Sequence, residues 1–306
     1  MANEIVDGIV LWFNVFYIAI VAFFKAFLPQ GVLPRKSVKG QTVLVTGAGS
    51  GIGRLTAYEF AKLGATVILW DVNGKGNEET KLKIEKSGGK AHAFTVDLSK
   101  REEIYETADK VKNGFGEVDI LVNNAGVVSG RNLLDCTDEQ IERTMAVNTT
   151  AHLWTVRAFL PGMLQKNNGH IVTIASIAGK IGAPQMVDYC TSKFGAVGFH
   201  ESLTLELETL GATGVKTTVV CPYFIDTGMF NGFKTLNTSL IPPLTPDYVV
   251  TCIMEAVLTN AQEVVIPKAC YVMAAAPTML PAAALRLIGS ALGIGDCMRD
   301  FKGRQK

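Results

Sequence analysis

The sequence has no paired cysteines of the C-x-x-C type, which argues against a zinc site or a redox dithiol. Its six cysteines stand singly, so we interpret them as reduced thiols of a chain that faces the cytosol. An excess of charge is missing too: the formal net charge is +1, which gives no reason to expect a nucleic-acid partner. Internal repeats and low-complexity tracts are also missing, and 306 residues suit one large α/β domain or two small ones.

Charged side chains are scarce, at 19% against 48% apolar residues, and part of the apolar excess lies in one run near the N-terminus. Residues 8–28 are nearly all apolar, with Asn14 and Lys25 as the only strongly polar side chains. About 20 such residues suffice to cross a bilayer, and no small-residue cleavage site follows, so we expect a membrane anchor rather than a signal peptide. The alternative is a buried core helix. Basic residues after the run place the main domain on the cytosolic side, and the anchor could span the bilayer or lie in one leaflet.

A glycine-rich loop follows the first predicted strand of the main domain. The strand covers residues 41–46 and leads into Gly47, Gly51 and Gly53, after which a helix is expected. Glycines between a strand and a helix let backbone N–H groups approach a pyrophosphate at the helix N-terminus. The loop therefore predicts a dinucleotide site.

An acidic residue stands at the end of the next predicted strand. Asp71 follows residues 66–70, about 20 positions after the glycine loop, where a carboxylate accepts the adenosine ribose hydroxyls. It would repel the 2′-phosphate of NADP(H), and no basic residue follows directly, so we expect NAD(H) as the cofactor. The alternative is a turn residue before Asn73. After one further strand, Asp97 and Leu98 could meet the adenine.

Strands and helices continue to alternate at a regular spacing. Strands at 91–96 and 120–122 flank a helix at 102–115, and the small-residue run 123–126 that follows lets a cofactor lie against the backbone. This alternation predicts βαβ units with right-handed crossovers. The predicted fold class is α/β, a doubly wound parallel sheet of the Rossmann type in a single domain, with an N-terminal membrane segment.

The residues with the clearest chemistry are Ser176, Tyr189 and Lys193. Tyr189 and Lys193 are four apart, so a helix puts them on one face, and a nearby ammonium lowers the pKa of a phenol from about 10 toward neutral pH. Such a tyrosine can exchange a proton with a carbinol or carbonyl oxygen. Ser176 follows the predicted strand 170–174, at the end where α/β sheets bind ligands. The alternative is a surface helix that carries Tyr-x-x-x-Lys by chance.

Asn148 lies among apolar neighbours in a predicted helix over residues 138–165. A buried amide must find hydrogen-bond partners. Two interpretations are open: a satisfied core amide, or a member of a proton relay that kinks the helix and orders a water beside the lysine.

These motifs, in this order and spacing, resemble the short-chain dehydrogenases/reductases from residue 39 to about residue 267. The resemblance implies that Tyr189 is the general acid/base and that Ser176 orients the substrate oxygen. It implies that Lys193 holds the nicotinamide ribose and lowers the pKa of Tyr189, and that Asn148 supports the relay. It also implies NAD contacts from Gly47, Ser50, Gly51, Ile52, Gly53, Asp71, Asp97, Leu98, Asn124, Ala125, Gly126, Tyr189, Lys193, Pro222 and Thr227.

One position departs from the family pattern. Tyr223 follows Pro222 where the family usually has glycine, whereas Thr227 stands where it is expected. This part of the sequence is similar to the membrane-bound branch of retinol dehydrogenases and lipid-droplet 17β-hydroxysteroid dehydrogenases. The branch implies a lipophilic alcohol, most of all all-trans-retinol, with a steroid as the alternative substrate and a lipid-droplet scaffold as the alternative class. Expected substrate contacts are Ser176, Tyr189, Tyr223, Met229 and Phe230. The loop after Thr227 continues through the apolar residues Phe233, Leu236, Leu240 and Ile241, and the alternative is that this loop packs against the protein's own core.

The C-terminal segment is apolar, but Pro277 and Pro281 argue against a straight helix. We expect a broken segment over residues 269–292 that lies on the membrane or covers the substrate entrance. The expected division is an anchor with linker (1–35), the dehydrogenase domain (36–268) and a membrane-associated segment (269–306). The family branch further implies a homodimer without a metal, at the endoplasmic reticulum membrane or the lipid droplet.

Overall fold

The computed structural model describes residues 2–27, 31–234, 242–291 and 294–303. Contacts divide the chain into two units, Met1–Lys36 and Ser37–Lys306. The C-terminal segment thus belongs to the same unit as the sheet. Leu236, Leu240 and Ile241 lie outside the described residues, as do the last residues of the predicted segments 8–28 and 269–292.

The first unit contains helix α1 (Ala2–Phe27). Its described side chains include many exposed apolar residues, among them Trp12, Phe13 and Phe16. Within the described ranges, no helix combines the length and the apolar character that a bilayer crossing requires. A spanning form of the predicted N-terminal segment is therefore not found in this part of the chain.

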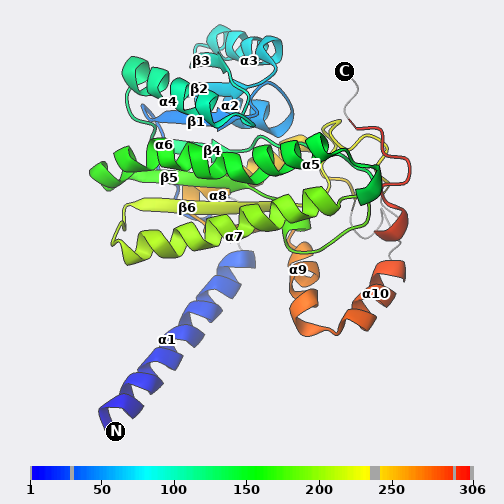
Figure 1. Ribbon diagram of the computed structural model, residues 1–306. Helices are drawn as coiled ribbons and strands as arrows, with labels where there is room; N and C mark the ends of the chain where they lie inside the picture. Colours follow the sequence, from blue (N-terminus) through cyan, green and yellow to red (C-terminus); the bar gives the residue numbers. More distant parts are fainter. Residues whose placement is uncertain (1, 28–30, 235–241, 292–293, 304–306) are drawn as a thin grey trace. The chain divides into compact units, whose positions relative to one another are not determined.

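The second unit is built on a seven-stranded parallel sheet, with strand order β3-β2-β1-β4-β5-β6-β7 (Figure 1). The predicted doubly wound α/β fold in a single dehydrogenase domain is confirmed. The strands are β1 (Thr42–Thr46), β2 (Thr66–Asp71), β3 (Lys90–Thr95), β4 (Ile120–Asn123), β5 (Gly169–Ile174), β6 (Val215–Pro222) and β7 (Glu263–Ile266).

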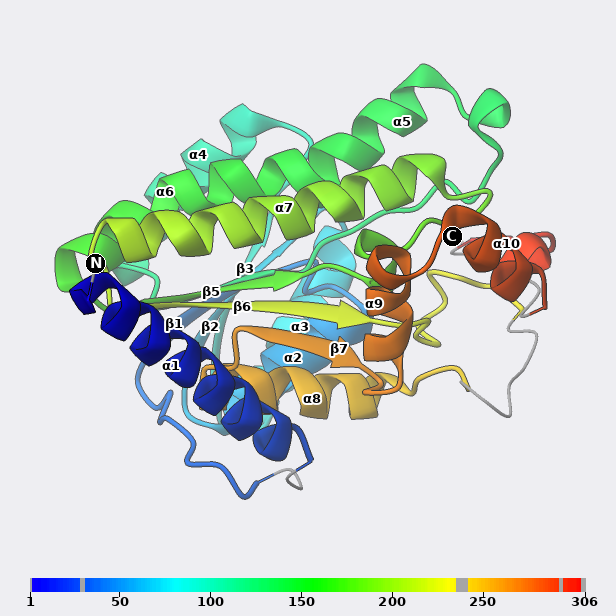
Figure 2. The same ribbon diagram turned by 90° about the horizontal axis from the view of Figure 1, so that it is seen from below.

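Helices cover both faces of the sheet, as Figure 2 shows from below. Successive side chains of a strand point to opposite faces, so Val43 and Val45 pack on one side and Leu44 on the other. The first face is covered by α2 (Gly51–Lys62), α3 (Gly74–Lys86) and α8 (Pro246–Thr259). The second is covered by α4 (Arg101–Phe115), α5 (Asp138–Met145), α6 (Ala151–Lys166) and α7 (Val187–Thr209).

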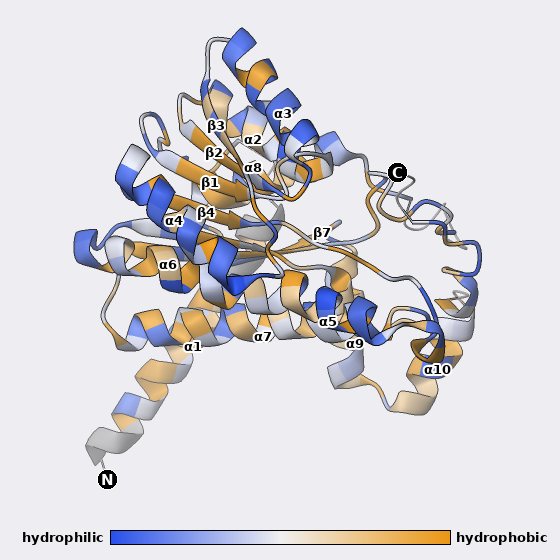
Figure 3. Ribbon diagram, turned by 45° about the horizontal axis from the view of Figure 1, so that its top comes forward, coloured by the Kyte–Doolittle hydropathy of each residue, from blue (hydrophilic) through white to orange (hydrophobic). Residues whose placement is uncertain are grey.

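The central strands are buried on both faces, which explains why they are almost continuously apolar in Figure 3. Trp70 of β2 meets Phe159 of α6 with the ring centroids 5.8 Å apart. The strand order reverses between β1 and β4, so the connections that leave their carboxyl ends lead to helices on opposite faces of the sheet. In open α/β sheets this reversal creates the crevice in which ligands bind.

The predicted helix over 138–165 is interrupted by a short π-helical turn, η2 (Ala146–Thr150), which separates α5 from α6. Asn148 lies in the middle of this turn. A π-turn inserts a residue into the helix, and such turns are frequent at functional sites.

The C-terminal segment is broken as its prolines predicted. Helix α9 (Cys270–Met279) and helix α10 (Ala282–Ala291) are separated by Leu280 and Pro281. Both helices expose large apolar side chains, such as Val272, Met279 and Leu287. Short 3-10 turns complete the unit at η1 (Leu133–Asp135), η3 (Ile177–Gly179) and η4 (Ile294–Asp296).

Candidate active site

The glycine loop joins β1 to α2 and leaves no room for a side chain at two positions. Gly47 has a φ of +68°, and its N–H donates to the carbonyl of Trp70 at 2.7 Å. A Cβ on Gly53 would lie 2.2 Å from the carbonyl oxygen of Gly47, so the first turn of α2 can approach the loop only with glycine there. The loop backbone is therefore close to the N-terminus of α2, where N–H groups favour a phosphate.

Asp71 ends β2 beside this loop. Its two carboxylate oxygens accept the N–H groups of Gly49 and Asn73, each at 2.8 Å. These bonds hold the carboxylate in a fixed orientation, and each oxygen can accept a further hydrogen bond. Asp71 is thus a turn residue and also part of the cavity wall.

The end of β4 is fixed by Thr46, to which the sequence analysis gave no separate role. Its buried hydroxyl oxygen accepts the N–H groups of Asn124 at 2.9 Å and Ala125 at 3.0 Å, and it donates to the carbonyl of Val122. The side-chain amide of Asn124 donates to the carbonyl of Thr46 at 2.8 Å. These bonds tie the small-residue run after β4 to the end of β1.

Asp97 and Leu98 follow β3 directly beside Asp71, since the N–H of Val96 donates to the Asp71 carbonyl at 3.0 Å. One carboxylate oxygen of Asp97 accepts both the N–H and the hydroxyl of Ser99. Burial acts to raise the pKa of Asp97, but the bonds from Ser99 and the charge of Arg143 leave this pKa below its usual value. Arg143 of α5 also lines the cavity, a contact that the sequence analysis missed because nothing in its local sequence marks it.

Ser176, Tyr189 and Lys193 come together at the carboxyl end of β5. Tyr189 and Lys193 lie in the first two turns of α7, buried at 5% and 3% exposure. The Lys193 ammonium lies 5.7 Å from the Tyr189 ring centroid and donates to the carbonyl of Ile174 at 2.9 Å. The Ser176 hydroxyl oxygen accepts the N–H of Ala178 at 3.1 Å. A surface helix is therefore excluded as the reason for the Tyr-x-x-x-Lys pattern.

The expected lowering of the pKa of Tyr189 is wrong for this structure. Burial raises its pKa, and this effect outweighs a hydrogen bond with Ser176 that acts to lower it. Burial also lowers the pKa of Lys193, to about 8. The sequence showed the ammonium four residues away but not the low-dielectric surroundings, which penalise both charged forms.

Asn148 is fully buried behind the cavity wall rather than on it. Its side-chain oxygen accepts the N–H of Val127 at 2.8 Å, and its amide donates to the Val127 carbonyl and the Ser192 hydroxyl. A Cβ placed on Gly126 would lie 3.5 Å from the Asn148 oxygen and 3.7 Å from the Lys193 nitrogen. The amide is thus satisfied, as the simpler interpretation required, and it lies close to the lysine.

One cavity of about 290 Å³ connects these parts. It is lined by every predicted cofactor contact, from the glycine loop and Asp71 through Gly126 to Pro222 and Thr227. The glycine loop at the N-terminus of α2 could hold the phosphates and Asp71 the ribose, so these residues fit a nicotinamide dinucleotide. Within the described ranges, no group of His, Cys, Asp and Glu side chains could hold a metal ion.

The cavity continues from Ser176 and Tyr189 into a largely apolar region. The predicted substrate contacts Tyr223, Met229 and Phe230 line it. Further wall residues were missed because they lie far away in the sequence or carry no motif: Phe224, Met273, Ile294 and Cys297.

Comparison with known proteins agrees with this geometry. Residues 41–236 match the short chain dehydrogenase family. Estradiol 17-beta-dehydrogenase 11 from Homo sapiens is 51% identical over 260 residues, 85% of each chain. Epidermal retinol dehydrogenase 2 from Mus musculus is 48% identical over 274 residues, 89% of each chain.

Solved structures share the fold. A short chain dehydrogenase/reductase from Burkholderia phymatum in complex with NAD is 27% identical, with a TM-score of 0.72 over 83% of this chain and 96% of that one. A metagenomic short-chain oxidoreductase in complex with NADP is 30% identical, with a TM-score of 0.64 over 76% and 98% of the two chains. The chain is therefore an oxidoreductase with a site for a nicotinamide cofactor, and it belongs to the short-chain dehydrogenase family.

Proposed function

We propose that this chain is an NAD-dependent alcohol dehydrogenase that oxidises all-trans-retinol to all-trans-retinal. The observation that carries the proposal is the contrast inside one cavity: the hydroxyls of Ser176 and Tyr189 lie where an apolar tunnel meets the cofactor cradle. An apolar wall favours a long apolar alcohol, and the few polar groups fix its hydroxyl end. Relatives named as retinol dehydrogenases support this substrate.

Each member of the polar group has a distinct role in the proposal. Tyr189 first releases its own proton to water and then, as a phenolate, takes the hydroxyl proton of the alcohol. Ser176 holds the same alcohol oxygen by a hydrogen bond. Lys193 holds the nicotinamide ribose, and its bond to the Ile174 carbonyl fixes its ammonium beside the Tyr189 ring. Asn148 keeps the Val127 backbone and the α7 hydroxyl of Ser192 in place behind the lysine. The nicotinamide, when bound, accepts the hydride from the carbinol carbon.

The preference for NAD rests on Asp71 and Arg54. The Asp71 carboxylate faces the position of the ribose and would repel a 2′-phosphate. Arg54, the nearby cation on α2, already donates to the carbonyl oxygens of Gly49 and Gly76 and pairs with Glu79. Its guanidinium is therefore engaged by protein oxygens, so it is poorly placed to compensate a phosphate charge.

A 17β-hydroxysteroid dehydrogenase is the second candidate function. It is favoured by the relative named estradiol 17-beta-dehydrogenase 11, whose identity of 51% exceeds the 48% of epidermal retinol dehydrogenase 2 from Mus musculus. The same catalytic group would serve a secondary alcohol. The wall beside Tyr189 then decides between the two substrates.

We also place the reaction at a lipid surface, the endoplasmic reticulum membrane or the lipid droplet, with the catalytic unit in the cytosol and the chain as a homodimer. Support comes from the exposed apolar side chains of α1, α9 and α10. Deleting residues 1–35 should release the protein from membranes only in part, because α9 and α10 remain. Fractionation of this deletion beside a deletion of residues 269–291 tests the assignment. Complete release by the first deletion alone would contradict it.

The decisive experiment for substrate is a competition in detergent. All-trans-retinol and estradiol are offered at equal concentration with NAD, and both products are quantified. We expect retinal to predominate in the parent protein and neither product with Tyr189→Phe. Preference for estradiol would make the second candidate correct, and no turnover of either alcohol would favour a lipid-droplet scaffold.

A further inference from the structure

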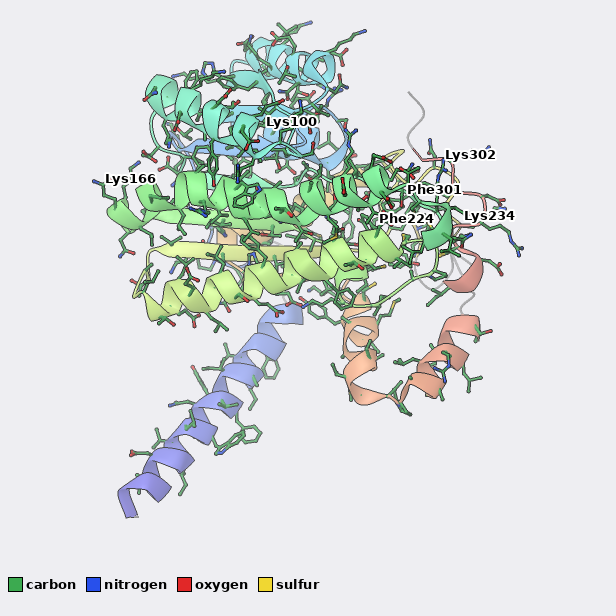
Figure 4. The ribbon with its side chains drawn as sticks, in the orientation of Figure 1. Lys100, Lys166, Phe224, Lys234, Phe301 and Lys302 are labelled. Atoms are coloured by element: carbon green, nitrogen blue, oxygen red, sulfur yellow. The ribbon has the colours of Figure 1, made fainter. Side chains whose placement is uncertain are left out.

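The C-terminal residues 294–303, which we name the strap, lie across the loop that follows β6. Figure 4 shows Phe301 and Lys302 of the strap in the same region as Phe224 and Lys234 of that loop. Two backbone bonds join the segments: Lys234 N–H donates to the Cys297 carbonyl at 2.9 Å, and Lys302 N–H donates to the Asn231 carbonyl at 2.7 Å. An ion pair between Lys234 and Asp300 adds a contact at the surface.

Two glycines make room for the strap. A Cβ on Gly232 would lie 1.9 Å from the carbonyl oxygen of Asp300, and a Cβ on Gly130 would lie 2.2 Å from the Phe301 ring. Both glycines also have positive φ, at +88° and +64°. Gly130 follows β4 and Gly232 follows β6, so two loops far apart in the sequence both accommodate this one segment.

The strap is part of the cavity wall and not a surface tail. Met298 and Cys297 are buried at 2% and 7% exposure, in one apolar cluster with Tyr189 and Met186. Ile294 and Cys297 line the cavity itself. The exposed Lys234–Asp300 pair contributes little to holding the strap, because solvent screens it; the buried apolar side chains hold it instead.

A row of aromatic rings connects the strap with the catalytic tyrosine. Phe301 meets Phe230 edge to face, with the centroids 6.4 Å apart. Phe230 in turn meets the Tyr189 ring edge to face at 5.6 Å. Phe233 packs against Phe230 from the side at 6.3 Å. Phe301 therefore limits how far Phe230 can move away from the reacting end of the cavity.

The structure assigns to the strap the role of a specificity wall: Phe301, as a positioning residue, holds Phe230 beside Tyr189 and excludes alcohols that are wide next to the carbinol carbon. The inference rests on the proposed alcohol dehydrogenase activity and adds what selects the substrate. All-trans-retinol carries its hydroxyl on a slim chain, whereas the hydroxyl of estradiol is on a ring fused to others. The wall therefore favours the first over the second.

The test compares kcat/KM for both alcohols in the parent, in Phe301→Ala and in Phe301→Leu. We expect Phe301→Ala to raise the estradiol-to-retinol ratio by roughly tenfold, mainly through KM for estradiol, since a change of wall volume is worth about this much. Phe301→Leu should give a smaller change in the same direction. Tyr248→Ala is the matched control, because it removes a partly exposed ring from α8 outside the cavity. An unchanged ratio in Phe301→Ala overturns the proposal.

A second measurement does not depend on turnover. Phe301 packs against the apolar cluster in which Cys297 is buried. Alkylation of Cys297 by N-ethylmaleimide, quantified by mass spectrometry, should therefore be slow in the parent and severalfold faster in Phe301→Ala. Cys221 in β6, fully buried, serves as the internal reference. If the parent oxidises neither alcohol, the proposed function fails, and the labelling alone then tests whether Phe301 holds the strap side of the cavity closed. Equal labelling of Cys297 in parent and variant overturns the wall in either case.

Discussion

The two halves of the cavity are built by different kinds of interaction. In the cofactor half, backbone conformation and hydrogen bonds fix the wall: Gly47 has a positive φ, and both oxygens of Asp71 accept backbone N–H groups. In the substrate half, apolar side chains such as Phe230, Phe233 and Cys297 pack against one another. Hydrogen bonds to the backbone demand one geometry, whereas apolar contacts tolerate changes of shape. This division suits a protein family whose members share a cofactor and differ in their substrates.

The catalytic residues stand where the two halves meet, so their removal should have the largest effect. We expect Tyr189→Phe to lower kcat by at least about 100-fold, in line with the usual contribution of general acid–base catalysis. NAD affinity should stay within a few-fold, since only the hydroxyl is lost. Steady-state kinetics and isothermal titration with NAD measure the two quantities. Turnover close to that of the parent would remove Tyr189 from its role.

Lys193→Ala should impair both cofactor binding and turnover, because its ammonium would hold the ribose and lies 5.7 Å from the Tyr189 ring centroid. We expect kcat to fall by roughly 100-fold and NAD affinity to fall as well. In the parent, NAD affinity should decrease as pH rises through about 8, because Lys193 loses its proton there. The variant should lack this pH dependence. Unchanged NAD binding in Lys193→Ala would separate the lysine from the cofactor.

Acid should destabilise the catalytic half through two buried histidines. Burial lowers the pKa of His152 to about 3 and that of His200 to about 4. In the unfolded chain, both histidines bind protons below about pH 6.5, whereas in the folded chain they stay neutral at that pH. The stability that these histidines contribute is therefore complete above about pH 6.5 and is lost as pH falls toward 4. His200 alone should account for about 3 kcal/mol of this loss.

Urea unfolding at pH 7.5 and pH 5 measures the part of that loss that occurs above pH 5, about 2 kcal/mol for His200. His200→Gln should reduce the difference in unfolding free energy between the two pH values. His92→Gln should reduce it less, because His92 lies at a partly exposed site on β3 where burial lowers its pKa as well. An equal pH dependence in the parent and in His200→Gln would show that other groups cause the acid sensitivity.

Asp71→Ala should have the smallest effect of these substitutions, and it should change only the choice of cofactor. Without the carboxylate, the ratio of kcat/KM for NAD over NADP should fall by roughly tenfold, equivalent to about 1.4 kcal/mol. Substrate preference should stay unchanged because the apolar half is not touched. A parent protein that prefers NADP would contradict the assignment before any variant is made.

The sequence by itself determined the cofactor half. Glycine spacing, an acid at the end of a strand and regular alternation of strands and helices are local features, and they predicted a doubly wound parallel sheet with right-handed crossovers. The placement of Ser176, Tyr189 and Lys193 was also predicted from local features, because the end of a strand and the turns of a helix determine where a side chain lies.

Tertiary structure decided the pKa values and the substrate wall. Burial raises the pKa of Tyr189 although a lysine lies one turn away, and burial is a property of the whole packed chain. The strap reaches the cavity only because residues near the C-terminus return to loops that follow β4 and β6, over Gly130 and Gly232. Contacts between segments this far apart in sequence leave no periodic or local signal, so the three-dimensional packing alone brings Phe301 to Phe230 and thereby to the catalytic tyrosine.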